Sequence, residues 1–297
     1  MNLKKLGKWL LLALAVLVIA FWIPKIHKSI MTSESQALGI SSVKSDKKAS
    51  SKLTEKSFQA ALNNASSNLT GNFNLEVYDV STGKTWTYTK GKGAPWFTAS
   101  IIKLNILAEC LIVQKSDGSN YTGNEKEWVD NMIQYSDDDS ATNLLGIVLG
   151  SYGDIGTDFT RFGMTNSHDG TSTSGWGYAQ VTAPDEMTFI KNIFLPSKVL
   201  TKGQQAFMQQ EMESVTSDQR WGISKFSPTI KTVALKNGWG ISDNVGGMVV
   251  NTVGSVTLQN GHEYLIVSLG DGFPDQQTGI NNQETVLAAA GKLITSN

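Results

Sequence analysis

The sequence has little of the chemistry that several common protein classes require. Its single cysteine, Cys110, excludes an internal disulfide and a cysteine-rich zinc site. Only three histidines are present; they are scattered along the chain, which favours structural or solvent-facing roles over a metal site. Lysine and arginine number 25 against 26 acidic residues, and no dense basic block favours nucleic acid. We therefore expect no metal, no other cofactor and no nucleic-acid partner.

What is present is typical of a globular protein, with 40% apolar residues and 28 glycines in 297 residues. This length allows one large domain or two small ones. No internal repeat is visible.

Residues 1–28 predict a membrane anchor. Three lysines precede an apolar run from Trp9 to Ile23, about 22 Å long as a helix and close to spanning a bilayer if Lys8 snorkels. The alternative is a cleaved secretory signal, although the bulky residues after the run offer no small-x-small cleavage site. The lysines favour an N-terminus inside the cell. Both alternatives place the rest of the chain outside the cytoplasm.

The rest of the chain divides into a linker and one domain. Residues 29–52 are rich in Ser, Lys and Thr and predict a flexible, solvated linker. Residues 53–297 predict an α/β fold of the α+β kind, in which helices flank an antiparallel five-stranded sheet and a helical subdomain is inserted. The strand-like runs are 73–80, 84–90, 231–239, 244–253 and 263–272, and the clearest helical patterns are 53–69, 99–114 and 276–295.

A serine and a lysine three residues apart form the first candidate site. Ser-x-x-Lys begins at Ser41, Ser45, Ser81 and Ser100, but the first two lie in the linker and the third in a hairpin turn. The fourth opens a helix that is apolar on nearly every side and is therefore predicted to be buried. Burial would lower the pKa of Lys103 toward the neutral form that accepts a proton. On this segment alone, a Lys103 that snorkels to the surface and a capping Ser100 remain the alternative.

Two further segments complete a known pattern. Residues 135–145 read YSDDDSATNLL, and residues 235–240 read LKNGWG on a predicted strand. Ser-x-x-Lys, Ser-Asp-Asn and Lys-Thr-Gly, in this order, are motifs of the penicillin-recognising serine enzymes. Over residues 53–297 the chain resembles these enzymes, and class A β-lactamases in particular. Residues 182–187, TAPDEM, are similar to the Thr-Pro-x-Asp-Met segment of that family.

The resemblance implies a role for each matching residue. Ser100 would attack a strained or activated carbonyl and form an acyl-enzyme, and Lys103 would take its proton directly or through water. Ser136 would pass a proton to the departing nitrogen, with Lys236 nearby holding a substrate carboxylate and tuning this transfer. The backbone N–H groups of Ser100 and Trp239 would form the oxyanion hole.

Two motif positions differ from the family and are predicted to alter substrate binding. Asp138 stands where the family has Asn, so a carboxylate that only accepts hydrogen bonds replaces an amide that donates. Its charge would also tend to keep the neighbouring lysines protonated. Asn237 stands where the family has Thr, and its amide can still donate to a carboxylate. Gly238 and Trp239 complete the predicted substrate-binding set.

A third difference concerns release of the acyl group. Class A β-lactamases use a glutamate to activate the deacylating water, yet this chain has no glutamate between Glu127 and Glu186. The corresponding region, 161–180, is rich in Gly, Ser and Thr. Asp158 or Asp169 could substitute, but neither lies in a recognisable motif. Without such a base, we expect a β-lactam adduct to persist.

These observations favour a monomeric, extracytoplasmic serine hydrolase that acts on a β-lactam or a related D-alanyl cell-wall peptide or ester. A penicillin-binding-protein-like carboxypeptidase, transpeptidase or esterase with slow deacylation is the enzymatic alternative. A tethered, non-catalytic cell-wall binding protein that kept the fold is the alternative from another class.

Overall fold

The computed structural model describes residues 53–150, 154–170, 175–242 and 245–296. The predicted anchor (1–28) and the predicted linker (29–52) both lie outside this range. Within the described residues, no helix has the length and apolar character needed to cross a membrane.

A five-stranded antiparallel sheet forms the centre of the domain, as the sequence predicts. Its strands are β1 (Asn72–Asp79), β2 (Thr85–Lys90), β5 (Ile230–Ser242), β6 (Gly247–Leu258) and β7 (Glu263–Asp271). They lie in the order β2-β1-β7-β6-β5, and each neighbouring pair is antiparallel. Pairing of β1 with β7 brings the N-terminal and C-terminal parts of the domain together in one sheet. This order leaves β5 as an edge strand.

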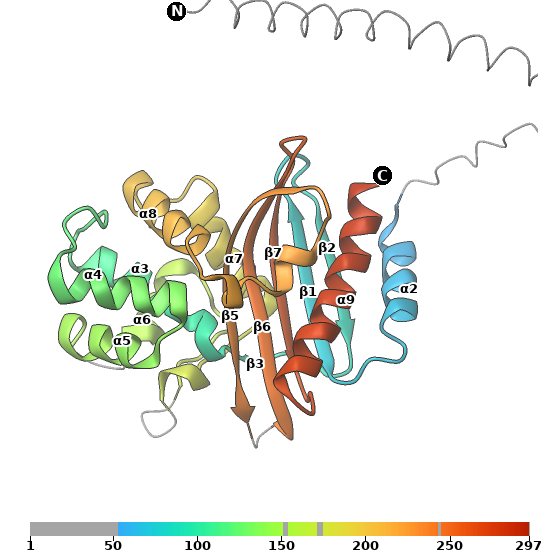
Figure 1. Cartoon of the computed structure of the whole chain (residues 1–297), viewed down its shortest axis with the longest axis horizontal. Coiled ribbons are helices and arrows are strands. Elements are labelled where there is room, and N and C mark those ends of the chain that lie inside the picture. The colour runs from blue at the N-terminus through green and yellow to red at the C-terminus, as the bar shows by residue number, and fades with distance from the viewer. Residues whose placement is uncertain (1–52, 151–153, 171–174, 243–244, 297) are drawn as a thin grey trace, which may run out of the picture. The chain divides into compact units, whose positions relative to one another are not determined.

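The sheet separates two hydrophobic cores. In β7, Leu265 and Val267 face the core that contains α3 (Lys103–Val113) and α7 (Ala183–Phe194), whereas Ile266 faces the core that contains α2 (Glu55–Ala65) and α9 (Gln276–Thr295). This alternation follows from the two-residue period of a strand. The helices on the second side are α2 (Glu55–Ala65) and α9 (Gln276–Thr295), which pack against each other and the sheet (Figure 1). Both have side-chain caps at their N-termini, from Thr54 and Asp275.

The chain between β2 and β5 is mainly helical, which confirms the predicted insertion. Figure 1 shows α3, α4, α5 and α6 grouped beside β5. The helices are α3 (Lys103–Val113), α4 (Gly123–Asp130), α5 (Asp138–Asn143), α6 (Asp154–Phe162), α7 (Ala183–Phe194) and α8 (Lys202–Glu213). The same segment contains two π-helical turns, η2 (Asn131–Tyr135) and η3 (Leu144–Val148). It also contains the 3-10 turns η1 (Ala99–Ile102), η4 (Trp176–Tyr178), η5 (Ser217–Gln219) and η6 (Gly222–Lys225). The short strands β3 (Trp96–Phe97) and β4 (Gln180–Val181) form a separate two-stranded sheet.

The helix that follows Ser100 is buried on all sides. Every residue of α3 from Lys103 to Leu111 is buried, so the alternative in which Lys103 snorkels to the surface is wrong. The first turn differs from the prediction, because Ala99–Ile102 form a 3-10 turn, η1, before the α-helix begins. Ala99 has a φ of 45°, a left-handed conformation that is unusual for a residue other than glycine.

Candidate active site

Residues of the sheet contact the backbone around Ser100 and position η1. The side-chain amide of Asn251, on β6, donates to the carbonyl oxygens of Phe97 and Thr98 at 2.8 and 3.0 Å. Gly238, on β5, lies so close to η1 that a Cβ added there would be 2.8 Å from the backbone nitrogens of Ser100 and Ile101. The predicted site residue Gly238 therefore lets the edge strand approach the candidate nucleophile. Sequence analysis missed Asn251, which no motif marks.

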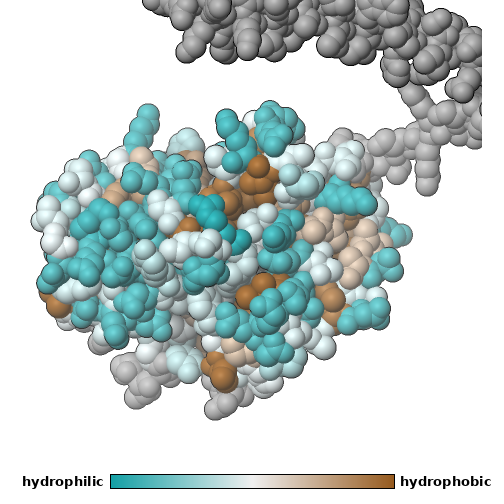
Figure 2. All heavy atoms as spheres, in the orientation of Figure 1, coloured by the Kyte–Doolittle hydropathy of each residue, from teal (hydrophilic) through white to brown (hydrophobic). Residues whose placement is uncertain are grey.

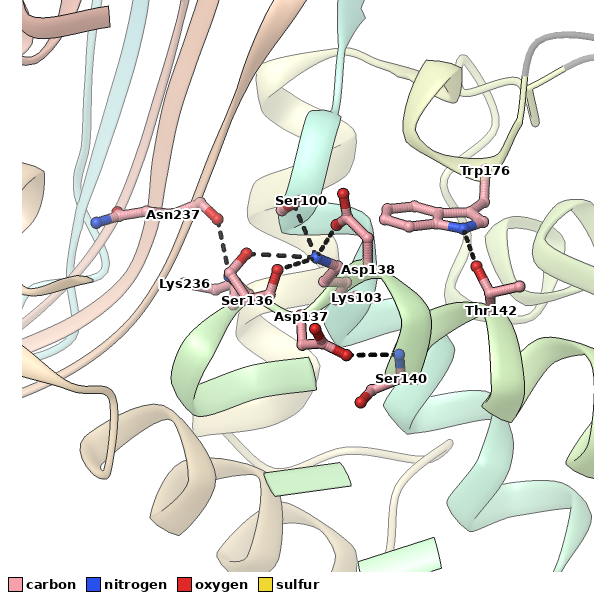
Figure 3. Close-up of polar contacts among 10 residues, drawn as sticks. All are labelled: Ser100, Lys103, Ser136, Asp137, Asp138, Ser140, Thr142, Trp176, Lys236 and Asn237. Carbon is pink, nitrogen blue, oxygen red and sulfur yellow. Dashed lines mark hydrogen bonds and ion pairs between the residues drawn. The ribbon is translucent and has the colours of Figure 1, made fainter. Parts of the chain in front are cut away.

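Lys103 lies beneath Ser100 and connects it to the second motif. Its side chain is fully buried, and its Nζ donates to Ser100 Oγ at 3.1 Å (Figure 3). The same nitrogen lies 2.6 Å from the carbonyl oxygen of Ser136 and 3.4 Å from its Oγ. It also forms an ion pair with Asp138 Oδ1 at 2.5 Å. Burial lowers the pKa of Lys103, while the hydrogen bond and charge of Asp138 and the charge of Asp137 oppose that shift.

Ser136 bridges the two lysines. It follows η2 in a left-handed conformation, with φ 61° and ψ 34°, which is uncommon for a serine. Lys236 Nζ, from β5, donates to Ser136 Oγ at 2.8 Å and to the carbonyl oxygen of Asn237 at 2.9 Å. Burial holds the pKa of Lys236 well below its usual value, and the positive charge of Lys103 acts in the same direction. The four residues predicted as catalytic thus form one continuous polar chain (Figure 3).

Asp137 and Asp138, which follow Ser136 directly, have different roles. Asp137 caps α5, because its carboxylate accepts from the backbone N–H of Ser140 at 2.7 Å. This hydrogen bond lowers the pKa of Asp137. Asp138 instead faces Lys103, and its side chain remains 75% exposed. The prediction that Asp138 puts a negative charge beside the lysines agrees with this geometry.

Asn237 does not have the orientation that the sequence analysis expected. Its side-chain amide donates to the carbonyl oxygens of Gln219 and Trp221 at 2.7 and 3.2 Å, and the residue is 1% exposed. Both amide hydrogens are therefore used within the protein. The expectation that this amide donates to a substrate carboxylate is wrong, because neighbouring residues of a strand point to opposite faces and Lys236 already faces Ser136.

A small cleft of about 150 Å³ adjoins Ser100. Besides Ser100, it is lined by Phe97, Ala99, Asp138, Trp176, Gly177, Tyr178, Trp239, Gly240, Ile241, Ser242 and Val249. Trp239 is thus at the site, as predicted, with its ring also packed against Trp221 at 6.0 Å between centroids.

Three aromatic residues of this cleft, Phe97, Trp176 and Tyr178, were missed by the sequence analysis. Trp176 and Tyr178 belong to η4, in the region rich in Gly, Ser and Thr. The ring of Trp176 lies over Lys103, 5.0 Å from Nζ to the centroid, and its Nε1 donates to Thr142 Oγ1 at 3.4 Å (Figure 3). The pair of aromatics in GWGY, residues 175–178, was the available signal, but local sequence does not say which surface they contact.

Neither candidate substitute for the missing glutamate lines the cleft. Asp158 is fully buried and accepts from Asn105 Nδ2 at 2.7 Å. Asn105 is two residues after Lys103, so it projects from the other side of α3. Burial raises the pKa of Asp158 well above its usual value. Asp169 lies beside Gly156 of α6. Among the described lining residues, Asp138 is the only carboxylate.

The fold and the order of these residues define a class A β-lactamase-like architecture, and comparison with solved structures supports this assignment. A class A β-lactamase from Bacteroides cellulosilyticus matches with a TM-score of 0.67 and 12% identity, over 82% of this chain and 99% of that chain. A β-lactamase from Chitinophaga pinensis matches with a TM-score of 0.63 and 17% identity, over 81% and 99%.

PBP-A has a TM-score of 0.63 and 18% identity, over 81% of this chain and 96% of that chain. A variant of PBP-A with a similar match was solved as an acyl-enzyme complex with penicillin G. No known family profile and no curated protein sequence matches the chain. The likeness therefore establishes the fold, while the chemistry rests on the residues of the site.

Proposed function

We propose that this protein is an extracytoplasmic serine hydrolase or acyltransferase that forms an acyl-enzyme on Ser100. The observation that carries the proposal is the 3.1 Å contact between Ser100 Oγ and the Nζ of the fully buried Lys103. A serine hydroxyl is a weak nucleophile without an adjacent base. Desolvation, which lowers the pKa of Lys103, makes this lysine a suitable base.

Acylation on this site proceeds in two proton transfers. Lys103 takes the proton of Ser100 as Oγ attacks the carbonyl carbon, and the backbone N–H groups of Ser100 and Trp239 stabilise the oxyanion. The leaving group departs with a proton delivered by Ser136, whose hydroxyl is 2.8 Å from Lys236 Nζ and 3.4 Å from Lys103 Nζ. The proton taken from Ser100 can thus reach the leaving group through Ser136.

Deacylation is expected to be slow. The only carboxylate among the described lining residues, Asp138, is engaged by Lys103 at 2.5 Å. The ring of Trp176 lies against the same lysine, with its centroid 5.0 Å from Nζ. Both features hinder activation of a hydrolytic water, which favours a penicillin-binding-protein-like enzyme over an efficient β-lactamase.

The non-catalytic alternative is favoured by one contact. The Asp138 carboxylate stabilises the charged form of Lys103, and a protonated lysine cannot accept the proton of Ser100. A protein in which this pair never separates would bind its ligand without reacting.

Mass spectrometry of the full chain separates these alternatives. After prolonged incubation with benzylpenicillin, we expect the mass to rise by that of the intact ligand, because ring opening loses no atoms, and peptide mapping to place the adduct on Ser100. Ser100→Ala should abolish it. A chromogenic cephalosporin, followed in parallel, should give an initial burst and slow turnover. Fast turnover would contradict slow deacylation, whereas absence of any Ser100-dependent adduct with β-lactams and activated esters would support the binding protein.

A further inference from the structure

The cleft beside Ser100 has predominantly apolar walls. Phe97 and Tyr178 meet edge to face, with ring centroids 5.9 Å apart, and Trp176 and Trp239 also contribute to the lining. Ile241, near the end of β5, is 73% exposed although it borders the same cleft. Figure 2 shows a small hydrophobic spot at this end of β5. An exposed isoleucine next to a nucleophile offers surface that a bound apolar group would cover.

The size of the cleft limits the group that it can hold. Its volume is about 150 Å³, and an apolar cavity of about this volume accommodates a benzene molecule. A phenyl ring or a chain of roughly six carbons therefore matches the volume of the cleft.

The charge of the cleft is unfavourable for a carboxylate. Among its described lining residues no side chain is cationic, and Asp138 is anionic. The two nearby lysines are 0% and 1% exposed, and their Nζ atoms are engaged by Ser100, Ser136, Asp138 and the Asn237 carbonyl. The amide of Asn237 is turned away from the site. A substrate carboxylate would thus meet the charge of Asp138, and none of the described lining residues supplies a cation to balance it.

We propose that the Ser100 cleft selects short, apolar, uncharged acyl esters, and that Asp138 is the residue that rejects donors carrying a carboxylate. This inference rests on the proposed function and names its substrate class. Ser100 Oγ bonds to the ester carbonyl carbon, the bond from that carbon to the alcohol oxygen breaks, and the alcohol leaves with the proton that Ser100 gave up. Water then cleaves the acyl-serine bond, which restores Ser100 and releases a carboxylic acid. At neutral pH this product ionises, so Asp138 also favours its departure.

Esters of one length and different charge test the proposal on the full chain. We expect kcat/KM for p-nitrophenyl butyrate to exceed that for the p-nitrophenyl monoester of succinate on the order of tenfold. Asp138→Asn should bring the two substrates to similar values, whereas Asp139→Asn, which changes an exposed neighbour outside the cleft, should leave the ratio unchanged. The ratio isolates selectivity, because any effect of Asp138 on the base acts on both substrates. Asp138→Ser provides a second uncharged side chain.

Chain length provides an independent measurement. From acetate through butyrate to hexanoate, kcat/KM should rise about threefold for each added methylene, and Ile241→Ser should flatten this rise.

Equal rates for the neutral and anionic esters, or a preference unchanged in both Asp138 variants, would overturn the role of Asp138 while the serine-hydrolase function stands. Absence of a chain-length effect would overturn the apolar acyl site. Loss of all Ser100-dependent acylation, with esters and penicillin alike, would instead refute the proposed function itself.

Discussion

Asp138 places a carboxylate in direct contact with the proposed base. The Asp138–Lys103 ion pair at 2.5 Å joins a fully buried ammonium to a side chain that is 75% exposed. Two effects therefore compete at Lys103, because desolvation lowers its pKa and the negative charge of Asp138 raises it. Acylation requires the neutral lysine, so the balance between these effects controls the rate at a given pH.

Removing that charge should shift the pH dependence of acylation. Asp138→Asn removes the negative charge that raises the pKa of Lys103, so this pKa falls further under the effect of desolvation. The increase of the acylation rate with pH should therefore occur at lower pH. Below the pKa, each unit of displacement increases the acylation rate about tenfold. Stopped-flow measurement of p-nitrophenol release from p-nitrophenyl butyrate between pH 5 and 10 would detect this shift. Asp139→Asn is the matched control, and a profile that stays in place or moves to higher pH would refute the assignment of Lys103 as base.

At the scale of single residues, the sequence predicted which side chains meet, but the predicted orientation of the Asn237 side chain was wrong. Ser100 and Lys103 share a helical face because of their spacing, and motif order brought Ser136 and Lys236 to the same place. Asn237 was placed in the site by analogy, whereas strand alternation turns its side chain toward Gln219 and Trp221. That error was avoidable from the sequence, because Lys236 and Asn237 are neighbours on one strand.

The position of η1 against β5 depends on the absence of one side chain. A Cβ on Gly238 would lie 2.8 Å from the Ser100 and Ile101 nitrogens and 2.8 Å from the Thr98 carbonyl oxygen. All three contacts are to backbone atoms, which cannot rotate away. Any larger residue at 238 therefore separates the edge strand from the turn that carries the nucleophile.

Gly238→Ala should reduce acylation far more than it reduces stability. Displacement of Ser100 by about 1 Å can lower a reaction rate on the order of a hundredfold. Gly146→Ala is the control outside the cleft, because a Cβ there also meets nothing within 4 Å. Acylation rate constants measured with a neutral ester, beside urea unfolding curves for both variants, would check this. Equal rates for the two variants would show that the close approach has no catalytic consequence.

Element positions were predictable where periodicity is strong and less so where segments are irregular. The final helix, predicted at 276–295, has these bounds in α9. By contrast, the strand predicted at 244–253 begins at Gly247 and ends at Leu258. The turn η4, which brings Trp176 to Lys103, could not be placed, because its glycine-rich sequence has no period that indicates a face.

At the scale of the whole molecule, the fold buries an ionisable group outside the site. Glu186, in α7, is fully buried, and neither of its carboxyl oxygens has a hydrogen-bond partner among the described residues. Burial raises the pKa of Glu186 to about 8, and the negative charge of Asp185 acts in the same direction. This helix packs against β1 and β7 in the first hydrophobic core. The packing of α7 in this core therefore requires a carboxyl group that stays protonated.

Glu186 should make the folded domain less stable as pH rises. The unfolded chain releases this proton near the ordinary value of 4.5, whereas the folded protein keeps it until about pH 8. Between these values the folded state binds more protons, so stability is fully present below about pH 4.5 and is lost up to about pH 8. From pH 5.5 to 7.5 the loss of stability from this group is roughly 2–3 kcal/mol.

Urea unfolding should show that Glu186→Gln, which cannot ionise, lacks this part of the decline in stability. Exposed Glu213→Gln should behave as the unaltered protein does. Parallel pH dependences for Glu186→Gln and the unaltered protein would mean that Glu186 is already ionised, or hydrated, in the folded domain.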